Sequence, residues 1–180
     1  MVRRTLYTKY NKRRGTLKKI REATKKDMIE IYMMGFDVWG DDMLSEEYVT
    51  MCQDSSKYKK GKWYVLEATD TKELLSSLIV YELNPSEEFI VKGIGSIATP
   101  LHLRKNGYAS LLVKETLNKL EQEENCNNFF LYSDIGTDFY NRLGFIALPN
   151  ESQKYKDSVC MYYSKENEID SLSFEIPNYF

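Results

Sequence analysis

Apolar residues along this chain recur with two spacings, and these spacings predict strands and helices in alternation. Alternating or continuous apolar runs are typical of strands, and apolar residues three and four positions apart are typical of one buried helical face. The predicted strands cover 17–23, 61–69, 74–83, 89–98, 129–133, 145–148 and 159–163. The predicted helices cover 25–36, 45–52, 109–120 and 137–143. The order β-α-α-β-β-β-α-β-α-β-β indicates one α/β domain.

Local signals refine the ends and irregularities of these elements. Thr24 followed by Asp27 has the spacing of a capping box, which predicts that the first helix begins directly after Thr24. The stretch 36–44 is rich in aromatic and acidic residues and is expected to be a loop between the first two helices. Gly93 and Gly95 lie inside the central predicted strand, where glycine indicates a bulge or the close approach of a ligand.

Charge divides the 180 residues unevenly. The net charge is −2, but residues 1–26 carry eleven Lys and Arg against Glu22 alone, and the remainder carries fourteen against twenty-six acids. We expect a basic N-terminal extension over 1–16, one domain over 17–165 and a tail without clear period over 166–180. The basic segment has two readings, a nucleic-acid-binding arm or a solvated extension lying against the acidic body, and the second is preferred, so no nucleic-acid partner is expected.

The cysteines and the hydropathy of the chain indicate the cellular compartment to expect. No apolar segment follows the N-terminal basic residues and no 18-residue apolar run exists, so neither a secretory signal nor a membrane span is expected. Cys52, Cys126 and Cys160 are odd in number and widely spaced, and His102 is the single histidine. We therefore expect structural cysteines in a reducing, cytoplasmic setting and no metal site, with a Cys–His catalytic pair as the less favoured reading.

The segment 95–113 carries the most informative motif. It is predicted as a strand, a short turn and the start of a helix, and Arg104, Gly107 and Ala109 give the spacing R-x-x-G-x-A. Small residues at the helix start let a ligand approach the free N–H groups of the first turn, where the helix dipole favours an anion. Phosphate suits such a site best. On spacing alone, a strand-to-helix turn without a ligand is an equally good reading.

A second motif, Asp138-Phe-Tyr-Asn-Arg-Leu-Gly-Phe145, follows about thirty residues later. With both motifs in this order, the chain resembles the GNAT superfamily of N-acetyltransferases from about residue 17 to residue 164. The first motif resembles the coenzyme A motif R/Q-x-x-G-x-G/A of that family, and the second resembles its F-Y-x-x-x-G-F signature. The resemblance implies a mixed, strongly twisted central sheet flanked by helices, with acetyl-CoA as co-substrate.

The resemblance also implies roles for individual residues. Tyr140, the tyrosine of the second motif, would protonate the departing thiolate, which is feasible because a phenol and a thiol have similar pKa values. The alternative for Tyr140 is a packing role. Ser133 stands where the family frequently has asparagine. The residues expected to hold the co-substrate are Ile97, Ala98, Thr99, Arg104, Lys105, Asn106, Gly107, Tyr108, Ala109 and Ser133.

A general base is harder to assign. Direct transfer of an acetyl group to an amine requires a neutral amine but no covalent enzyme intermediate. Many family members carry a carboxylate on the central strand, and this chain has none there. Asp134, or Glu67 and Glu82 acting through water, are the candidates, and each also reads as an ordinary solvated acid.

The acceptor amine is expected beside the stretch 36–44. Trp39, Asp41 and Asp42 place an indole and two carboxylates there, a combination that suits a cationic amine. The alternative is a solvated acidic loop in which Trp39 anchors the core.

Together these observations predict an acetyl-CoA-dependent N-acetyltransferase that acts directly on a primary amine of a small, cationic acceptor. The alternatives are an acetyltransferase of peptide or protein amines, a coenzyme A-binding regulatory domain without turnover, and a nucleic-acid-associated protein that uses the basic N-terminus. A homodimer is included among the expected assemblies.

Overall fold

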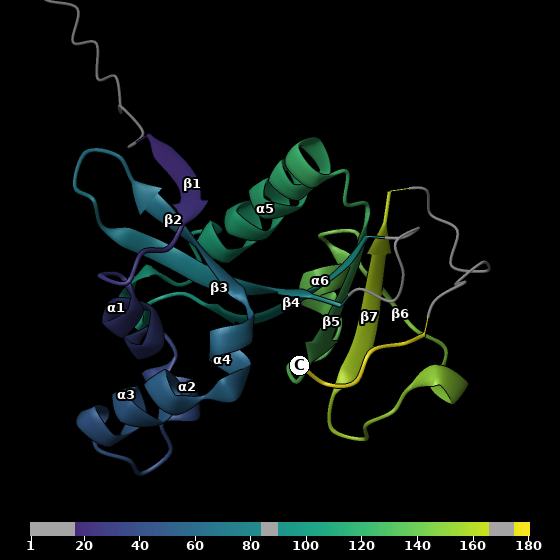
Figure 1. The fold of residues 1–180 in the computed structure, drawn as a ribbon, viewed down its shortest axis with the longest axis horizontal. Helices are drawn as coiled ribbons and strands as arrows, with labels where there is room; N and C mark the ends of the chain where they lie inside the picture. Colours follow the sequence, from purple (N-terminus) through teal and green to yellow (C-terminus); the bar gives the residue numbers. More distant parts are fainter. Residues whose placement is uncertain (1–16, 84–89, 166–174) are drawn as a thin grey trace, which may run out of the picture.

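The computed structural model describes residues 17–83, 90–165 and 175–180. The basic extension and the first part of the predicted tail lie outside the described residues. Within the described residues the chain forms an open seven-stranded sheet in the order β1-β2-β3-β4-β5-β7-β6 (Figure 1). The strands are β1 (Lys18–Glu22), β2 (Lys62–Ala68), β3 (Leu74–Glu82), β4 (Val91–Ala98), β5 (Asn128–Ser133), β6 (Ile146–Ala147) and β7 (Val159–Ser164).

Parallel and antiparallel pairings are combined, so the predicted mixed α/β sheet is confirmed. The pair β4–β5 is parallel, and the other neighbours are antiparallel. The helices are α1 (Met28–Met33), α2 (Phe36–Trp39), α3 (Ser45–Asp54), α4 (Ser56–Lys60), α5 (Tyr108–Glu124) and α6 (Asp138–Asn141). Short 3₁₀ turns occupy Leu101–Leu103 and Asn150–Ser152. In the described part of the chain, no helix combines the length and apolar character that crossing a bilayer requires.

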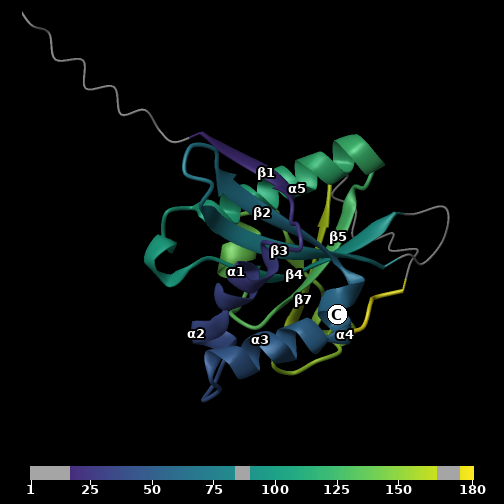
Figure 2. The same ribbon diagram turned by 60° about the vertical axis from the view of Figure 1, so that its left-hand side comes forward.

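Helices cover both faces of the sheet, as Figures 1 and 2 show. The group α1–α4 lies on one face, where Trp63 and Val65 of β2 pack with residues of α1 and α3. The long helix α5 lies on the other face, where Tyr64 and Leu66 of the same strand are buried with it. Because both faces are covered, β2 and β3 read as nearly continuous apolar runs.

The helix α5 carries the predicted apolar stripe. Its buried residues are Leu112, Val113, Thr116, Leu117 and Leu120, all of which recur at three- and four-residue spacing. The helix continues to Glu124 and ends at Asn125, which has a left-handed φ of 54°. The helix predicted over 109–120 is therefore longer than expected, because polar residues on the exposed side of a helix and in a turn look alike.

The first predicted helix, 25–36, is wrong in its extent. The segment after Thr24 forms a turn instead of the first turn of a helix. In it, the Asp27 carboxylate accepts hydrogen bonds from the Thr24 N–H (2.6 Å), from the Thr24 hydroxyl (2.8 Å) and from Arg21. The helix begins only after this turn, and it breaks before Gly35. The ring of Trp39 packs against Gly35 so closely that a side chain there would clash. The predicted loop 36–44 consequently contains the helix α2.

The expected bulge in the central strand is present. Ile79 pairs with Gly95 and Ser77 with Ala98, so β4 has one more residue than β3 between these pairs. The positive φ of 45° belongs to Ser96 rather than to a glycine. At Gly93 the close approach is made by the ring of Phe180, from the same chain.

Beyond Gly93 the sheet opens. Among the described residues, β4 and β5 pair only over Val91–Gly93 and Asn128–Phe130, although β4 continues to Ala98. The main-chain groups of the second half of β4 therefore face a gap on the β5 side. This gap positions the site described below.

A cluster of charges fastens β1 to the first turn and to β2. Arg21 forms salt bridges with Asp27 (2.8 Å) and with the buried Glu67 (2.7 Å), and Lys19 reaches Glu67 at 3.3 Å. The hydrogen bond from Arg21 holds the pKa of Asp27 far below its ordinary value and also lowers the pKa of Glu67.

We predict that Asp27→Asn lowers the free energy of unfolding by about 1 kcal/mol at neutral pH, because a charge-assisted bond to Arg21 is lost. A carboxylate with a depressed pKa in the folded state stabilises the fold above its unfolded pKa, about 4, and this contribution is lost as the pH falls further. Urea unfolding at pH 7 and pH 3 should therefore show a deficit for the variant that shrinks in acid. Asp157→Asn, which changes an exposed carboxylate, is the matched control, and an equal deficit at both pH values would contradict the prediction.

Candidate active site

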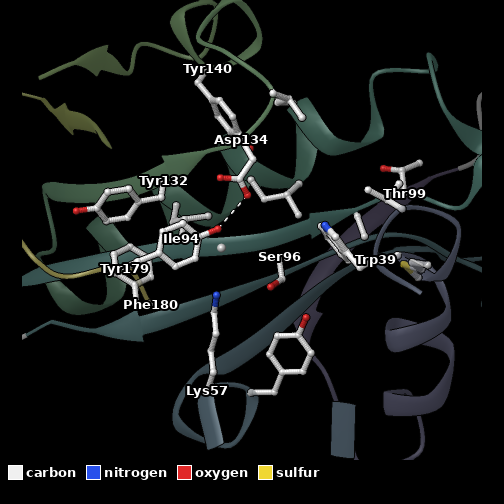
Figure 3. A pocket seen from close by; sticks show the side chains of 18 of the residues that line it. Trp39, Lys57, Ile94, Ser96, Thr99, Tyr132, Asp134, Tyr140, Tyr179 and Phe180 are labelled. Atoms are coloured by element: carbon white, nitrogen blue, oxygen red, sulfur yellow. Dashed lines mark hydrogen bonds between the residues drawn. The ribbon is translucent and has the colours of Figure 1, made fainter. Parts of the chain in front are cut away.

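Where β4 and β5 diverge, the surface encloses a cavity of about 570 Å³, shown in Figure 3. Its floor is the stretch from Ile94 to Thr99, at and just beyond the end of β4, and one wall follows β5 with Tyr132 and Asp134. The opposite wall comes from α2 and α4, and the C-terminal residues Tyr179 and Phe180 close one side. We call this space the first chamber.

A second chamber of about 620 Å³ surrounds the start of α5. Its lining includes Lys105, Gly107, Tyr108, Ala109 and Ser110. Both chambers share the lining residues Ile97, Thr99, Arg104, Ile135 and Tyr140. The two spaces therefore meet, with Tyr140 at their junction.

The turn before α5 is shaped for close approach to the helix start. Gly107 has φ 78°, and no atom lies within 4 Å of the position that a Cβ would take. The first intrahelical bond runs from the Leu111 N–H to the Gly107 carbonyl (2.9 Å), so the N–H groups before Leu111 precede the helical ladder. These N–H groups and the helix dipole make the turn suitable for phosphate oxygens.

The polar side chains of this turn serve different purposes. Arg104 donates to the Thr99 carbonyl (3.0 Å) and to Asp37 of α2 (2.6 Å), which ties α2 to the loop after β4. Asn106 donates to the carbonyls of Leu103 and Arg104 and so holds the turn itself. The side-chain amide of Asn106 is therefore used by the protein, whereas Arg104 lines both chambers.

The bulge at the end of β4 is held by a residue of the neighbouring strand β3. The hydroxyl of the buried Ser76 donates to the Ala98 carbonyl (2.7 Å) and lies 3.0 Å from the Thr99 hydroxyl. These contacts hold Ala98 at the first chamber and Thr99 where both chambers meet. The sequence contained no signal for Ser76, because its partner is 22 residues away.

Tyr140 is 8% exposed and packs edge-on against Phe139 and Phe145. Burial raises its pKa to about 12, and the negative charge of Asp134 adds to the shift. The phenol is therefore protonated at neutral pH and can act as a proton donor at the junction.

Asp134 is the carboxylate of the first chamber, and Tyr179 holds it. The Tyr179 hydroxyl donates to Asp134 at 3.0 Å (Figure 3). Burial, together with this bond, raises the pKa of Tyr179 to about 12. Tyr179 itself is placed by the Tyr155 hydroxyl, which accepts its N–H (3.1 Å), and by Tyr132, whose hydroxyl donates to the Pro177 carbonyl (2.7 Å).

The other candidates for a general base are engaged elsewhere. Glu67 is bound to Arg21 and Lys19, and Glu82 is bound to the buried Lys92. Neither glutamate lines either chamber. Asp134 is thus the one of the three candidates that reaches the site.

Besides Asn106, which holds the turn, three other residues of the predicted site line neither chamber. The hydroxyl of Ser133 donates to the Gly136 carbonyl (2.5 Å) and stabilises the turn after β5. Asp41 and Asp42 are exposed and do not line the first chamber, because the chain turns outward at Asp41 with φ 43°. Trp39, from the same predicted group, does line it.

Sequence reasoning missed Lys57, Tyr58, Tyr179 and Phe180, which all line the first chamber. The first two belong to α4, and the last two end a tail without clear period. Cys52, Cys126 and Cys160 are buried and free, and His102 lies on the surface 3.7 Å from Glu73. Among the described residues, no group of three or more His, Cys, Asp or Glu side chains could hold a metal ion.

Comparison with known proteins gives consistent results. The family described as "Acetyltransferase (GNAT) domain" matches residues 19–147. A search of curated proteins found no match. A chimera of spermidine N-acetyltransferase SpeG from Vibrio cholerae and hSSAT shares 14% identity at a TM-score of 0.63, covering 83% of this chain and 96% of that chain.

Two more solved structures are similar. The dodecameric spermidine N-acetyltransferase from Vibrio cholerae has a TM-score of 0.62 at 14% identity, covering 84% of this chain and 96% of that chain. Spermidine/spermine N-acetyltransferase SpeG from the same organism, in complex with manganese ions, has a TM-score of 0.58 at 16% identity, covering 82% and 92%. At these identities the likeness concerns the fold.

If the turn before α5 holds phosphate, Gly107→Glu should weaken binding of coenzyme A by about tenfold or more, because a carboxylate would lie at the anion site. Gly107→Gln has nearly the same bulk and backbone strain without the charge, and it should bind markedly better than the glutamate variant. Calorimetric titration with coenzyme A compares the two, and equal affinities would reject a phosphate site at this turn.

Proposed function

This chain belongs to the GNAT family of acetyltransferases and is an N-acetyltransferase; we propose that it transfers an acetyl group directly from acetyl-CoA to a primary amine of a small acceptor. The observation that carries the proposal is the junction of the two chambers at Tyr140. One chamber offers a phosphate-binding turn, and the other offers a carboxylate among aromatic rings. A donor in the second chamber and an acceptor in the first would meet beside the phenol.

The donor's place follows from groups that the fold leaves accessible. The pyrophosphate would accept N–H bonds at the turn of residues 104–109. The pantetheine arm would then run along Ile97–Thr99, where β4 has separated from β5, and its amides could pair with the strand as an added strand does. Arg104 would stay bound to Asp37 or turn to the phosphates.

The reaction then needs few protein groups. The acceptor's ammonium would lie near Asp134 and lose a proton through water, and the neutral amine would attack the thioester carbon. The new C–N bond forms, the nitrogen releases its second proton, and the C–S bond breaks. The thiolate takes its proton from the Tyr140 hydroxyl, which solvent reprotonates. The overall reaction produces an amide, free coenzyme A and one proton.

The form of the first chamber favours a small acceptor over a protein. Tyr179 and Phe180 cover one side of it, so an extended polypeptide would have to displace them. Trp39 and the tyrosines can stack on a cation, and amines are also the substrates named for the Vibrio cholerae structures.

Asp41 and Asp42 are not part of this proposal. The cytoplasmic location and the homodimer remain predictions.

The direct test is thermal unfolding with acetyl-CoA, followed by detection of the coenzyme A thiol in the presence of small amines. Ligand at a hundred times its Kd stabilises the native state by about 2.7 kcal/mol, which raises the melting temperature by several degrees. Binding with amine-dependent thiol release supports the proposal. Binding without release from any amine would favour the regulatory domain, and absence of binding would remove acetyl-CoA as the donor.

Tyr140→Phe should lower kcat by roughly a hundredfold, because the departing thiolate loses its proton donor. The affinity for acetyl-CoA should change little, since the ring remains. Tyr163→Phe removes another hydroxyl from the core, away from both chambers, and should leave kcat unchanged. A parallel loss of kcat and acetyl-CoA affinity in Tyr140→Phe would indicate a packing role.

A further inference from the structure

Lys57 brings a positive charge into the first chamber. It belongs to α4, and its ammonium points into the cavity toward Tyr179 and Asp134 (Figure 3). The ammonium lies 4.6 Å from the centroid of the Tyr179 ring. Arg104, which also lines this chamber, already has Asp37 as its anionic partner. In the described part of the chain, no carboxylate forms a salt bridge with Lys57.

The positive charge of Lys57 is unfavourable in these surroundings unless an anion lies beside it. Burial lowers its pKa, and the charge of Asp134 opposes that shift without a direct ion pair. A partly buried cation with an aromatic ring as its principal contact is poorly compensated. A carboxylate supplied by a ligand would provide the missing charge and hydrogen-bond acceptors.

Besides Arg104, which is paired with Asp37, the described lining of the first chamber has two charged groups, Lys57 and Asp134, and their charges are opposite. Asp134 receives the Tyr179 hydroxyl and attracts an ammonium, whereas Lys57 attracts an anion. A plain diamine would find favourable charge only at Asp134 and would be repelled at Lys57. A molecule with both an amine and a carboxylate satisfies both groups.

We infer that the acceptor is an amino acid, whose carboxylate binds Lys57 and whose amine lies toward Asp134 and the junction at Tyr140. The inference rests on the proposed acetyl transfer and narrows its acceptor class. The volume of about 570 Å³ is in the range of small-molecule sites. Tyr58, Tyr179 and Phe180 supply aromatic surface for the rest of the acceptor.

The inference can be tested with acceptor pairs that differ by one carboxylate. The panel contains the twenty standard amino acids and decarboxylated partners such as tyramine for tyrosine and cadaverine for lysine. Thiol release gives kcat/KM, and mass spectrometry identifies the acetylated product. The wild-type protein should show a higher kcat/KM for the amino acid that it acetylates than for the decarboxylated partner of that amino acid.

Lys57→Met should lower kcat/KM for that amino acid by about tenfold to a hundredfold, the range of a hydrogen bond to a charged group, mainly through KM. The decarboxylated partner should be affected little or should improve. Lys59→Met, which removes an exposed lysine from the same helix, should change neither. Lys57→Arg keeps the charge and should retain most of the preference.

Other outcomes separate the inference from the proposal beneath it. If acetyl-CoA stabilises the protein and only decarboxylated amines are acetylated, the transfer stands and the amino-acid acceptor is wrong. The amino-acid acceptor is equally wrong if Lys57→Met slows both members of a pair alike, because Lys57 would then only anchor Tyr179. Turnover of no panel member despite acetyl-CoA binding also rejects the amino-acid acceptor. Absence of acetyl-CoA stabilisation removes the transfer itself.

Discussion

The pairing of β4 with β5 ends after Gly93, and the site depends on this interruption. A parallel pair that stayed in register would have satisfied the main chain of β4 and left no space between the strands. Two features lie beside this interruption: the β3–β4 bulge, in which Ser96 has a positive φ, and the ring of Phe180, which packs against Gly93. The bond from Ser76 to the Ala98 carbonyl then fixes the end of the strand at the first chamber.

Several parts of this arrangement could be read from the sequence because their signals are local. The stripe of α5 repeats within one helix, and the turn at Gly107 combines a positive φ with an open approach that only glycine supplies easily. Tyr140 was singled out by the resemblance that the second motif carries, and the structure places it at the junction of the two chambers. The bulge was indicated by neighbouring glycines, although the strained residue is Ser96.

Other parts depend on contacts between distant segments and could not be read in this way. The start of α1 is decided by Arg21, which draws Asp27 into a turn, so the apparent capping box at Thr24 misplaces the helix. Asp41 and Asp42 looked like substrate ligands because they are close in sequence to Trp39, but a turn sends them outward. Lys57 and Tyr179 carry no motif, and they become neighbours only when the C-terminal segment lies beside α4, as in Figures 1 and 2.

The packing of Phe180 on Gly93 joins segments far apart in the chain. The second chamber is built from residues between Ile97 and Arg142, whereas the first needs residues from 34 to 180. Long-range contacts of this kind close late in folding, since more chain must be ordered before they form. The pocket for one reactant can thus be assembled while the pocket for the other is unfinished. A local opening that releases the last residues would likewise dismantle one chamber and spare its neighbour.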